Sequence, residues 1–132
     1  METDFDDPLL ALDGLVAGYG KLTVLNETSF RVPRGAITTV IGPNGAGKST
    51  VFKAVFGLLP LQRGRVIFDG RDTAGLQPRR LLELGIVYVP QGRNVFPELS
   101  VLHNLEMGAA EPDPARIDAV MARFPVLREK AG

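Results

Sequence analysis

The chain has 132 residues, enough for one domain with a hydrophobic core, and its 45% hydrophobic content is typical of soluble globular proteins. Lys plus Arg and Asp plus Glu both number 15, and the resulting formal charge of zero gives no electrostatic footprint for nucleic acid or for an anionic membrane surface. The sequence has no cysteine, which excludes disulfides, thiolate metal sites and cysteine nucleophiles.

The N-terminus is acidic where a secretory signal would be basic and then apolar. No apolar run approaches the roughly 18 residues that a membrane-spanning helix needs. We therefore expect an acidic, disordered tail over residues 1–8, a domain over residues 9–132 and a cytoplasmic location.

The first half of the predicted domain is rich in strand signals. Strands are predicted over residues 9–16 and 28–32, with a turn-rich stretch at 17–20 and a stop at Pro33. Residues 36–41 form an almost wholly apolar or β-branched run, which is typical of a strand buried on both faces. Two strands followed by a buried strand are therefore expected.

Helical spacing begins after this run. The apolar residues of 48–58 recur with a helical period, and Gly57 lies close to a natural stop. A strand over residues 65–68 is predicted to run into a tight turn at 69–70, and a short helix is predicted over 78–84.

The remaining sequence repeats the same kinds of element. Residues 86–89 predict another buried strand, Ser100 is placed to cap a helix over 101–107, and Asp113 is placed to start one over 115–124. Early strands followed by strand–loop–helix units predict an α/β fold, or an α/β fold with an antiparallel flap.

A glycine-rich loop joins the buried strand to the first helix and matches the phosphate-loop pattern G-x-x-x-x-G-K-[ST] without a gap. With the residue that follows, the loop consists of Gly42, Pro43, Asn44, Gly45, Ala46, Gly47, Lys48, Ser49 and Thr50. Its glycines allow the backbone N–H groups to surround phosphate oxygens, and the following helix adds the positive end of its dipole. We expect Lys48 to reach the β- and γ-phosphates, Ser49 to ligate Mg²⁺, and Thr50 to donate on the α-phosphate side. The loop therefore predicts binding of a nucleotide, most simply ATP with Mg²⁺.

The loop sequence resembles the Walker A motif of ATP-binding cassette (ABC) ATPases. The resemblance implies a P-loop NTPase core, with Tyr19 as the aromatic residue that stacks on adenine and Gln91 as the Q-loop glutamine that serves Mg²⁺ or the attacking water. In that family the Q-loop also contacts the membrane partner.

Three further segments resemble the ATP-binding subunit of branched-chain amino acid importers. They are residues 19–25, residues 68–72 and the stretch 85–105 around Gln91. Many of those subunits have Glu in place of Gln91, and the urea-type subunit has a very similar segment, so the transported solute stays open.

The family's later motifs do not occur in the sequence. Leu-Ser-Gly-Gly-Gln, an apolar strand ending in Asp-Glu, and a switch histidine are absent, and the single histidine, His103, fits an ordinary helix residue. The resemblance therefore implies the N-terminal part of an ABC ATPase, from a truncated gene, an incomplete sequence record or an engineered fragment. Without the acidic residues that hold Mg²⁺ and activate water, we expect the 132 residues alone to be inactive.

For the parent protein the resemblance implies ATP hydrolysis with catalytic roles for Lys48 and Gln91. It also implies transmembrane permease subunits, a second ATP-binding subunit, attachment to the inner face of the membrane through those partners only, and no nucleic acid. Arg93 and Phe96 either contact the permease or serve their own loop as a solvated charge and a packed ring. The other hypotheses are a nucleotide-binding remnant without catalysis, an ABC protein of repair or translation, and an unrelated phosphate-loop kinase.

Overall fold

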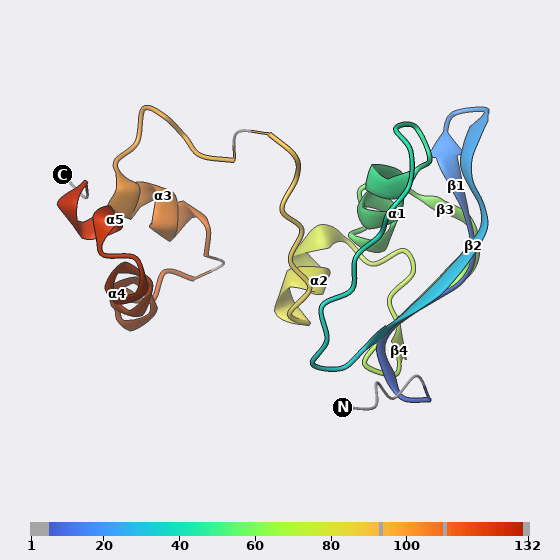
Figure 1. Ribbon diagram of the computed structural model, residues 1–132, viewed down its shortest axis with the longest axis horizontal. Helices are drawn as coiled ribbons and strands as arrows, with labels where there is room; N and C mark the ends of the chain where they lie inside the picture. Colours follow the sequence, from blue (N-terminus) through green and yellow to red (C-terminus); the bar gives the residue numbers. More distant parts are fainter. Residues whose placement is uncertain (1–5, 93, 110, 131–132) are drawn as a thin grey trace. The chain divides into compact units, whose positions relative to one another are not determined.

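The computed structural model describes residues 6–92, 94–109 and 111–130, and the chain divides into two compact units, Met1–Tyr88 and Val89–Gly132. Figure 1 shows the elements of both units, and its labels are used below. The elements of the first unit are β1 (Pro8–Tyr19), β2 (Leu22–Pro33), α1 (Lys48–Val55), β3 (Leu61–Phe68), β4 (Arg71–Asp72) and α2 (Pro78–Glu83). The elements of the second unit are α3 (Val101–Met107), α4 (Pro114–Arg123) and α5 (Val126–Glu129).

The described strands of the first unit form one antiparallel sheet in the order β2-β1-β3-β4. Leu12 of β1 lies opposite Phe30 of β2 on one side and Val66 of β3 on the other. The antiparallel pair expected before the glycine-rich loop is therefore confirmed. Both strands are longer than predicted, and Tyr19 pairs with Leu22 where the sequence suggested a turn. The strands extend this far because Ala17, two residues before Tyr19, is buried in the core opposite Leu25.

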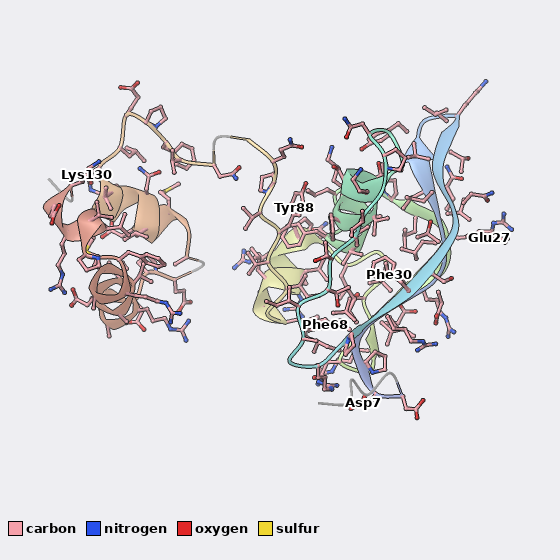
Figure 2. The ribbon with its side chains drawn as sticks, viewed as in Figure 1. Asp7, Glu27, Phe30, Phe68, Tyr88 and Lys130 are labelled. Atoms are coloured by element: carbon pink, nitrogen blue, oxygen red, sulfur yellow. The ribbon has the colours of Figure 1, made fainter. Side chains whose placement is uncertain are left out.

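The core forms between this sheet and helix α1. Its buried members come from β1, β2, β3, α1 and the segment after α1, and they are Leu12, Leu15, Ala17, Leu25, Val51, Ala54, Val55, Leu59 and Val66. Phe30, labelled on β2 in Figure 2, packs against this cluster, whereas the exposed Glu27 on the same strand is outside it. The alternation of buried and exposed positions along β2 is the pattern of a strand with one covered face. The sheet thus holds α1 by its apolar side.

Helix α1 ends where the sequence places a stop. Gly57 adopts φ +69°, its N–H donates to Ala54 O at 3.2 Å, and the next N–H, of Leu58, donates to Lys53 O at 2.9 Å. These two bonds form a Schellman motif, which requires a left-handed residue at the position of Gly57. A Cβ there would also lie 2.5 Å from the carbonyl oxygen of Leu76. The predicted stop is confirmed.

Two predicted strands do not form. Residues 36–41 and 86–89 have no strand structure, and within the described ranges no strand pairs with either of them. The exposed fraction is 99% for Ile37 and 90% for Ile41. In the second run Val87 is 71% exposed, although the ring centroid of Tyr88 lies 5.7 Å from that of Phe56. An apolar run becomes a β-strand only when a neighbouring strand pairs with its backbone N–H and C=O groups. The described sheet provides no such strand for either run.

Turn and cap predictions elsewhere are confirmed. Asp69 and Gly70 form the turn between β3 and β4, and α2 begins at Pro78. In the second unit, the Ser100 hydroxyl accepts from the N–H of His103 at the start of α3, and the Asp113 carboxylate accepts from the N–H of Ala115 at the start of α4. Each side chain satisfies a helix N–H that lacks a partner within the helix.

The described part of the acidic N-terminus is attached to the sheet. Asp7 and Asp69 both pair with Arg34, at 3.1 and 2.6 Å, and Pro8 opens β1. The hydrogen bonds from Arg34 to Asp69 and to Asp7 raise the pKa of Arg34 above its ordinary value, and the bond to Asp69 has the larger effect. Residues 1–5 of the predicted tail lie outside the described residues. Among the helices of the described ranges, none has the length and apolarity that crossing a membrane requires.

Candidate functional site

The glycine-rich loop leads into α1 through a left-handed glycine. Gly47 has φ +88° and is the N-cap of the helix, and its carbonyl accepts from the N–H of Val51 at 2.9 Å. A Cβ at Gly47 would lie 3.1 Å from Leu25 Cδ2 and 3.4 Å from Val24 Cγ1, both on β2. The loop therefore needs glycine here for its backbone conformation and for its close approach to the sheet.

The start of α1 suits an anion. No side chain caps the helix, and its first turn contains no acidic residue. The first N–H groups of a helix have no acceptor within it, and the helix dipole adds partial positive charge at this end. Because Gly45 also adopts φ +83°, the loop has the alternating backbone conformations that turn N–H groups toward a bound oxyanion. The residues present therefore fit a phosphate group.

Lys48 adds a full positive charge beside these N–H groups. Its ammonium donates to Gly42 O at 2.7 Å and to Pro43 O at 2.6 Å, so it folds back onto the loop that precedes it. A lysine ammonium has three donors, so these two bonds are compatible with a further contact to an anion. The structure thus brings the loop backbone, the helix N-terminus and Lys48 together, as the motif predicts.

The two hydroxyl residues after Lys48 differ in exposure. Ser49 is exposed in the first turn of α1, and its oxygen is the kind of ligand that Mg²⁺ takes. Thr50 is buried in the same turn. Their roles toward Mg²⁺ and the α-phosphate stay predictions.

Tyr19 lies at the end of β1 in the hairpin that packs on α1, and 49% of it is exposed. The ammonium of Lys53, in α1, lies 5.9 Å from the centroid of the Tyr19 ring and 3.5 Å from its hydroxyl oxygen. Lys53 could not be identified from the sequence, because 34 residues separate it from Tyr19 and nothing in its spacing indicates a contact. The adenine-stacking role of Tyr19 stays a prediction.

The other predicted site residues belong to the second unit. Gln91 is exposed there, and its action beside the phosphate loop stays a prediction. Arg93 lies outside the described residues. Phe96 is exposed while its backbone is hydrogen-bonded to Asn104. His103 lies in helix α3, as predicted, and is exposed.

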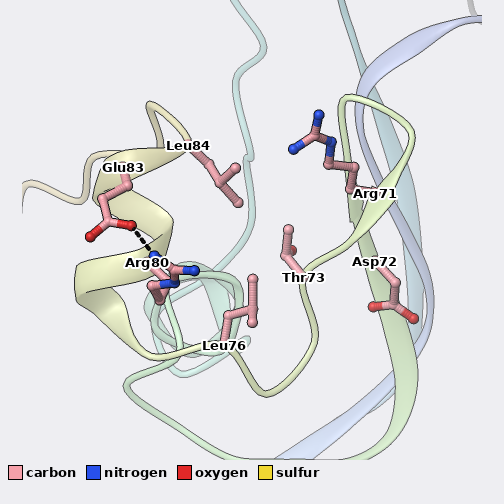
Figure 3. A pocket seen from close by; sticks show the side chains of 7 residues that line it. All are labelled: Arg71, Asp72, Thr73, Leu76, Arg80, Glu83 and Leu84. Carbon is pink, nitrogen blue, oxygen red and sulfur yellow. Dashed lines mark hydrogen bonds and ion pairs between the residues drawn. The ribbon is translucent and has the colours of Figure 1, made fainter.

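A pocket of about 270 Å³ lies elsewhere in the first unit, between β4 and α2 (Figure 3). Its lining residues are Arg71, Asp72, Thr73, Leu76, Arg80, Glu83 and Leu84, so no residue of the phosphate loop contributes. Arg80 is paired with Glu83 at 2.6 Å, and the Asp72 carboxylate accepts from the N–H of Ala74. The balanced charges of this pocket do not favour an anion, so the phosphate loop is the stronger candidate site.

The sequence model of the ABC transporter family matches residues 25–131. The chain belongs to the ABC transporter family. Among curated ABC relatives, the probable branched-chain amino acid transport ATP-binding protein LivF of Archaeoglobus fulgidus is 42% identical over 118 residues, covering 86% of this chain and 50% of the relative. The high-affinity branched-chain amino acid transport ATP-binding protein BraG of Pseudomonas aeruginosa is 36% identical over 126 residues, covering 92% of this chain and 54% of the relative.

Solved ABC structures share the fold. A nucleotide-free ATP-binding cassette from an ABC transporter superposes with a TM-score of 0.73 at 32% identity, covering 89% of this chain and 46% of that chain. A bacterial Atm1-family ABC exporter with ATP bound superposes with a TM-score of 0.73 at 28% identity, covering 92% of this chain and 21% of that chain. The expected ABC cassette fold is therefore confirmed, and this chain spans about half the length of the curated relatives above.

Proposed function

We propose that the complete protein binds ATP with Mg²⁺ on the loop 42–50 and hydrolyses it to power the import of branched-chain amino acids through a membrane permease. One observation carries the nucleotide site: Gly47 turns the loop into the N-terminus of α1 while Lys48 lies on the same loop. Backbone N–H groups, a helix dipole and one ammonium group are the means by which proteins hold a triphosphate. The printed names of the LivF and BraG relatives support the transport role.

The proposed residue roles rest on side-chain chemistry and on the resemblance to ABC ATPases. Lys48 neutralises charge on the β- and γ-phosphates, and the buried Thr50 donates on the α-phosphate side. By the resemblance to ABC ATPases, Ser49 and Gln91 would hold Mg²⁺, and Gln91 would orient the attacking water. Mg²⁺, when bound, offsets the negative charge that develops on the phosphate oxygens. Tyr19 stacks on adenine with the exposed part of its ring.

The proposed partners are transmembrane permease subunits and a second ATP-binding subunit. The transport function of the named relatives supports the permease. The protein would then work at the inner face of the cell membrane and attach there through the permease alone.

Replacing Lys48 tests the ATPase proposal in the complete gene product. Lys48→Ala should lower ATP turnover by about 10²-fold or more, because a charge aimed at the transferring phosphate is removed. Lys130→Ala removes one positive charge from an exposed lysine that is not part of the 42–50 loop and should leave turnover unchanged. Wild-type turnover by the Lys48→Ala protein would contradict the proposal.

Uptake measurements test the transported solute. In cells that lack the gene, the wild-type protein should restore leucine uptake and the Lys48→Ala protein should not. Restoration of urea uptake, with leucine uptake unaffected by the gene, would assign the protein to the urea-type systems instead.

For the 132-residue chain alone we propose nucleotide binding without hydrolysis. The sequence contains the phosphate loop but neither a Leu-Ser-Gly-Gly-Gln segment nor an Asp-Glu strand end, so an acidic Mg²⁺ ligand and a base for water are lacking. ATP titration by calorimetry alongside a phosphate-release assay tests this. Hydrolysis above background that Lys48→Ala removes would contradict it.

A further inference from the structure

We propose that Lys53 is a positioning residue for the nucleotide base, because its ammonium holds the Tyr19 ring in place. Lys53 thereby links the ring that stacks on the base to helix α1, whose N-terminus holds the phosphates. The inference rests on the proposed binding of ATP at this site. It concerns a residue outside the phosphate-loop motif.

The contact joins two elements that are far apart in the sequence. Lys53 Nζ lies 5.9 Å from the centroid of the Tyr19 ring, within the range of a cation–π interaction. The same ammonium lies 3.5 Å from the Tyr19 hydroxyl oxygen, at the outer limit for a hydrogen bond. The ammonium of Lys53 therefore lies toward the hydroxyl end of the Tyr19 ring.

The backbone of Lys53 is fixed. Its carbonyl accepts from the N–H of Leu58 at 2.9 Å in the bond that closes α1, and its neighbour Ala54 is buried in the core. Tyr19, in contrast, lies next to the hairpin turn and is half exposed. An exposed ring at a hairpin end has freedom to rotate, and a cation on a fixed stem limits that freedom.

Helix α1 carries both ends of the proposed coupling. Lys48 begins the helix and Lys53 lies five residues later, about 7.5 Å further along the helix axis. The same rigid element thus presents one ammonium to the phosphate loop and another to the aromatic side chain. The ammonium lies nearer the Tyr19 hydroxyl oxygen, at 3.5 Å, than the ring centroid, at 5.9 Å, so it lies toward the hydroxyl end and leaves the ring face for an adenine base.

Comparing ATP with inorganic tripolyphosphate isolates the base contribution, because only ATP has a ring to stack. In the complete gene product, Tyr19→Ala should weaken ATP binding at least about fivefold and leave tripolyphosphate binding unchanged. Lys53→Met keeps the stem and removes the charge, and it should weaken ATP binding about two- to fivefold with tripolyphosphate again unchanged. Lys53→Arg keeps a cationic donor that can reach the Tyr19 hydroxyl and should bind ATP like the wild type.

Two further variants complete the test. Lys21→Met removes one positive charge from the exposed turn of the same hairpin and should bind both ligands normally. The double variant Tyr19→Ala/Lys53→Met should bind ATP no more weakly than Tyr19→Ala alone, because Lys53 acts through Tyr19.

The outcomes separate this inference from the proposed function. If Lys53→Met leaves ATP affinity unchanged or raises it, or weakens both ligands equally, the positioning role of Lys53 is wrong. If Lys48→Ala leaves the binding of both ligands unchanged, the phosphate site itself is wrong.

Discussion

Asn104 and Phe96 exchange a pair of hydrogen bonds in the second unit. The N–H of Phe96 donates to Asn104 Oδ1 at 2.7 Å, and Asn104 Nδ2 donates to Phe96 O at 3.0 Å. The same amide nitrogen lies 3.1 Å from Leu99 O and 3.0 Å from Ser100 O. One half-buried side chain therefore attaches the loop from Phe96 to Ser100 to helix α3.

Asn104→Ala should free this loop. Removing the amide leaves the Phe96 N–H and several carbonyls without their partner, at a cost of about 1 kcal/mol or more of local stability. Hydrogen exchange by mass spectrometry should then be about fivefold faster or more over residues 94–100. His103→Ala changes a neighbouring exposed side chain of α3 and should leave exchange in the loop unchanged. Equal exchange in the Asn104→Ala and wild-type proteins would show that other contacts order the loop.

Gly47→Ala should destabilise the phosphate loop. The residue has φ +88°, where a side chain costs about 1–2 kcal/mol, and the new Cβ would press on Leu25 and Val24. Thermal unfolding should show the loss, and ATP binding should weaken with it.

Gly42→Ala is the matched stability control for Gly47→Ala. A Cβ at Gly42 would meet only Ala46 Cβ at 3.6 Å and Lys48 Cδ at 3.9 Å, which are ordinary contacts. We expect an unfolding midpoint near that of the wild type. If both variants unfold at the same temperature, the backbone conformation at Gly47 does not carry the cost assigned to it.

Features that depend on neighbouring residues in the chain could be predicted from the sequence. The caps at Ser100 and Asp113 and the stop at Gly57 use side chains or conformations within a few residues of the helix end. The glycine-rich loop belongs to the same class, because its glycines and Lys48 lie in one short segment.

Features that depend on distant partners could not be predicted in this way. The runs 36–41 and 86–89 have strand composition, but strand structure needs a ladder partner that composition does not reveal. The contact of Lys53 with Tyr19 and the four hydrogen bonds of Asn104 depend on side-chain directions fixed only by the folded chain. Polar contacts of this kind leave no periodic signal in the sequence.

Leu15→Ala should be among the most destabilising single changes to the first unit. Leu15 is fully buried in the cluster between the sheet and α1, and truncating a buried leucine costs about 2–5 kcal/mol. Leu22→Ala removes the same atoms from an exposed position and should change stability by less than about 0.5 kcal/mol. Thermal unfolding of the complete gene product, followed by circular dichroism, measures both. A small effect at Leu15 would mean that the sheet and α1 do not share one core.

Ile37 and Ile41 allow the exposed apolar run to be tested directly. Both side chains are almost fully exposed in the 132-residue chain, and exposed apolar surface binds hydrophobic dyes and promotes association. Ile37→Asn/Ile41→Asn should therefore reduce fluorescence of the dye ANS and reduce aggregation of this chain, while its thermal midpoint stays close to that of the wild type. Val126→Asn, an exposed position in α5, should change dye binding less because it lies outside the run. A large fall in the thermal midpoint of the double variant would contradict the exposure of these two side chains, because asparagine is destabilising only where it replaces a buried isoleucine. That result would favour the strand that the sequence predicts over residues 36–41.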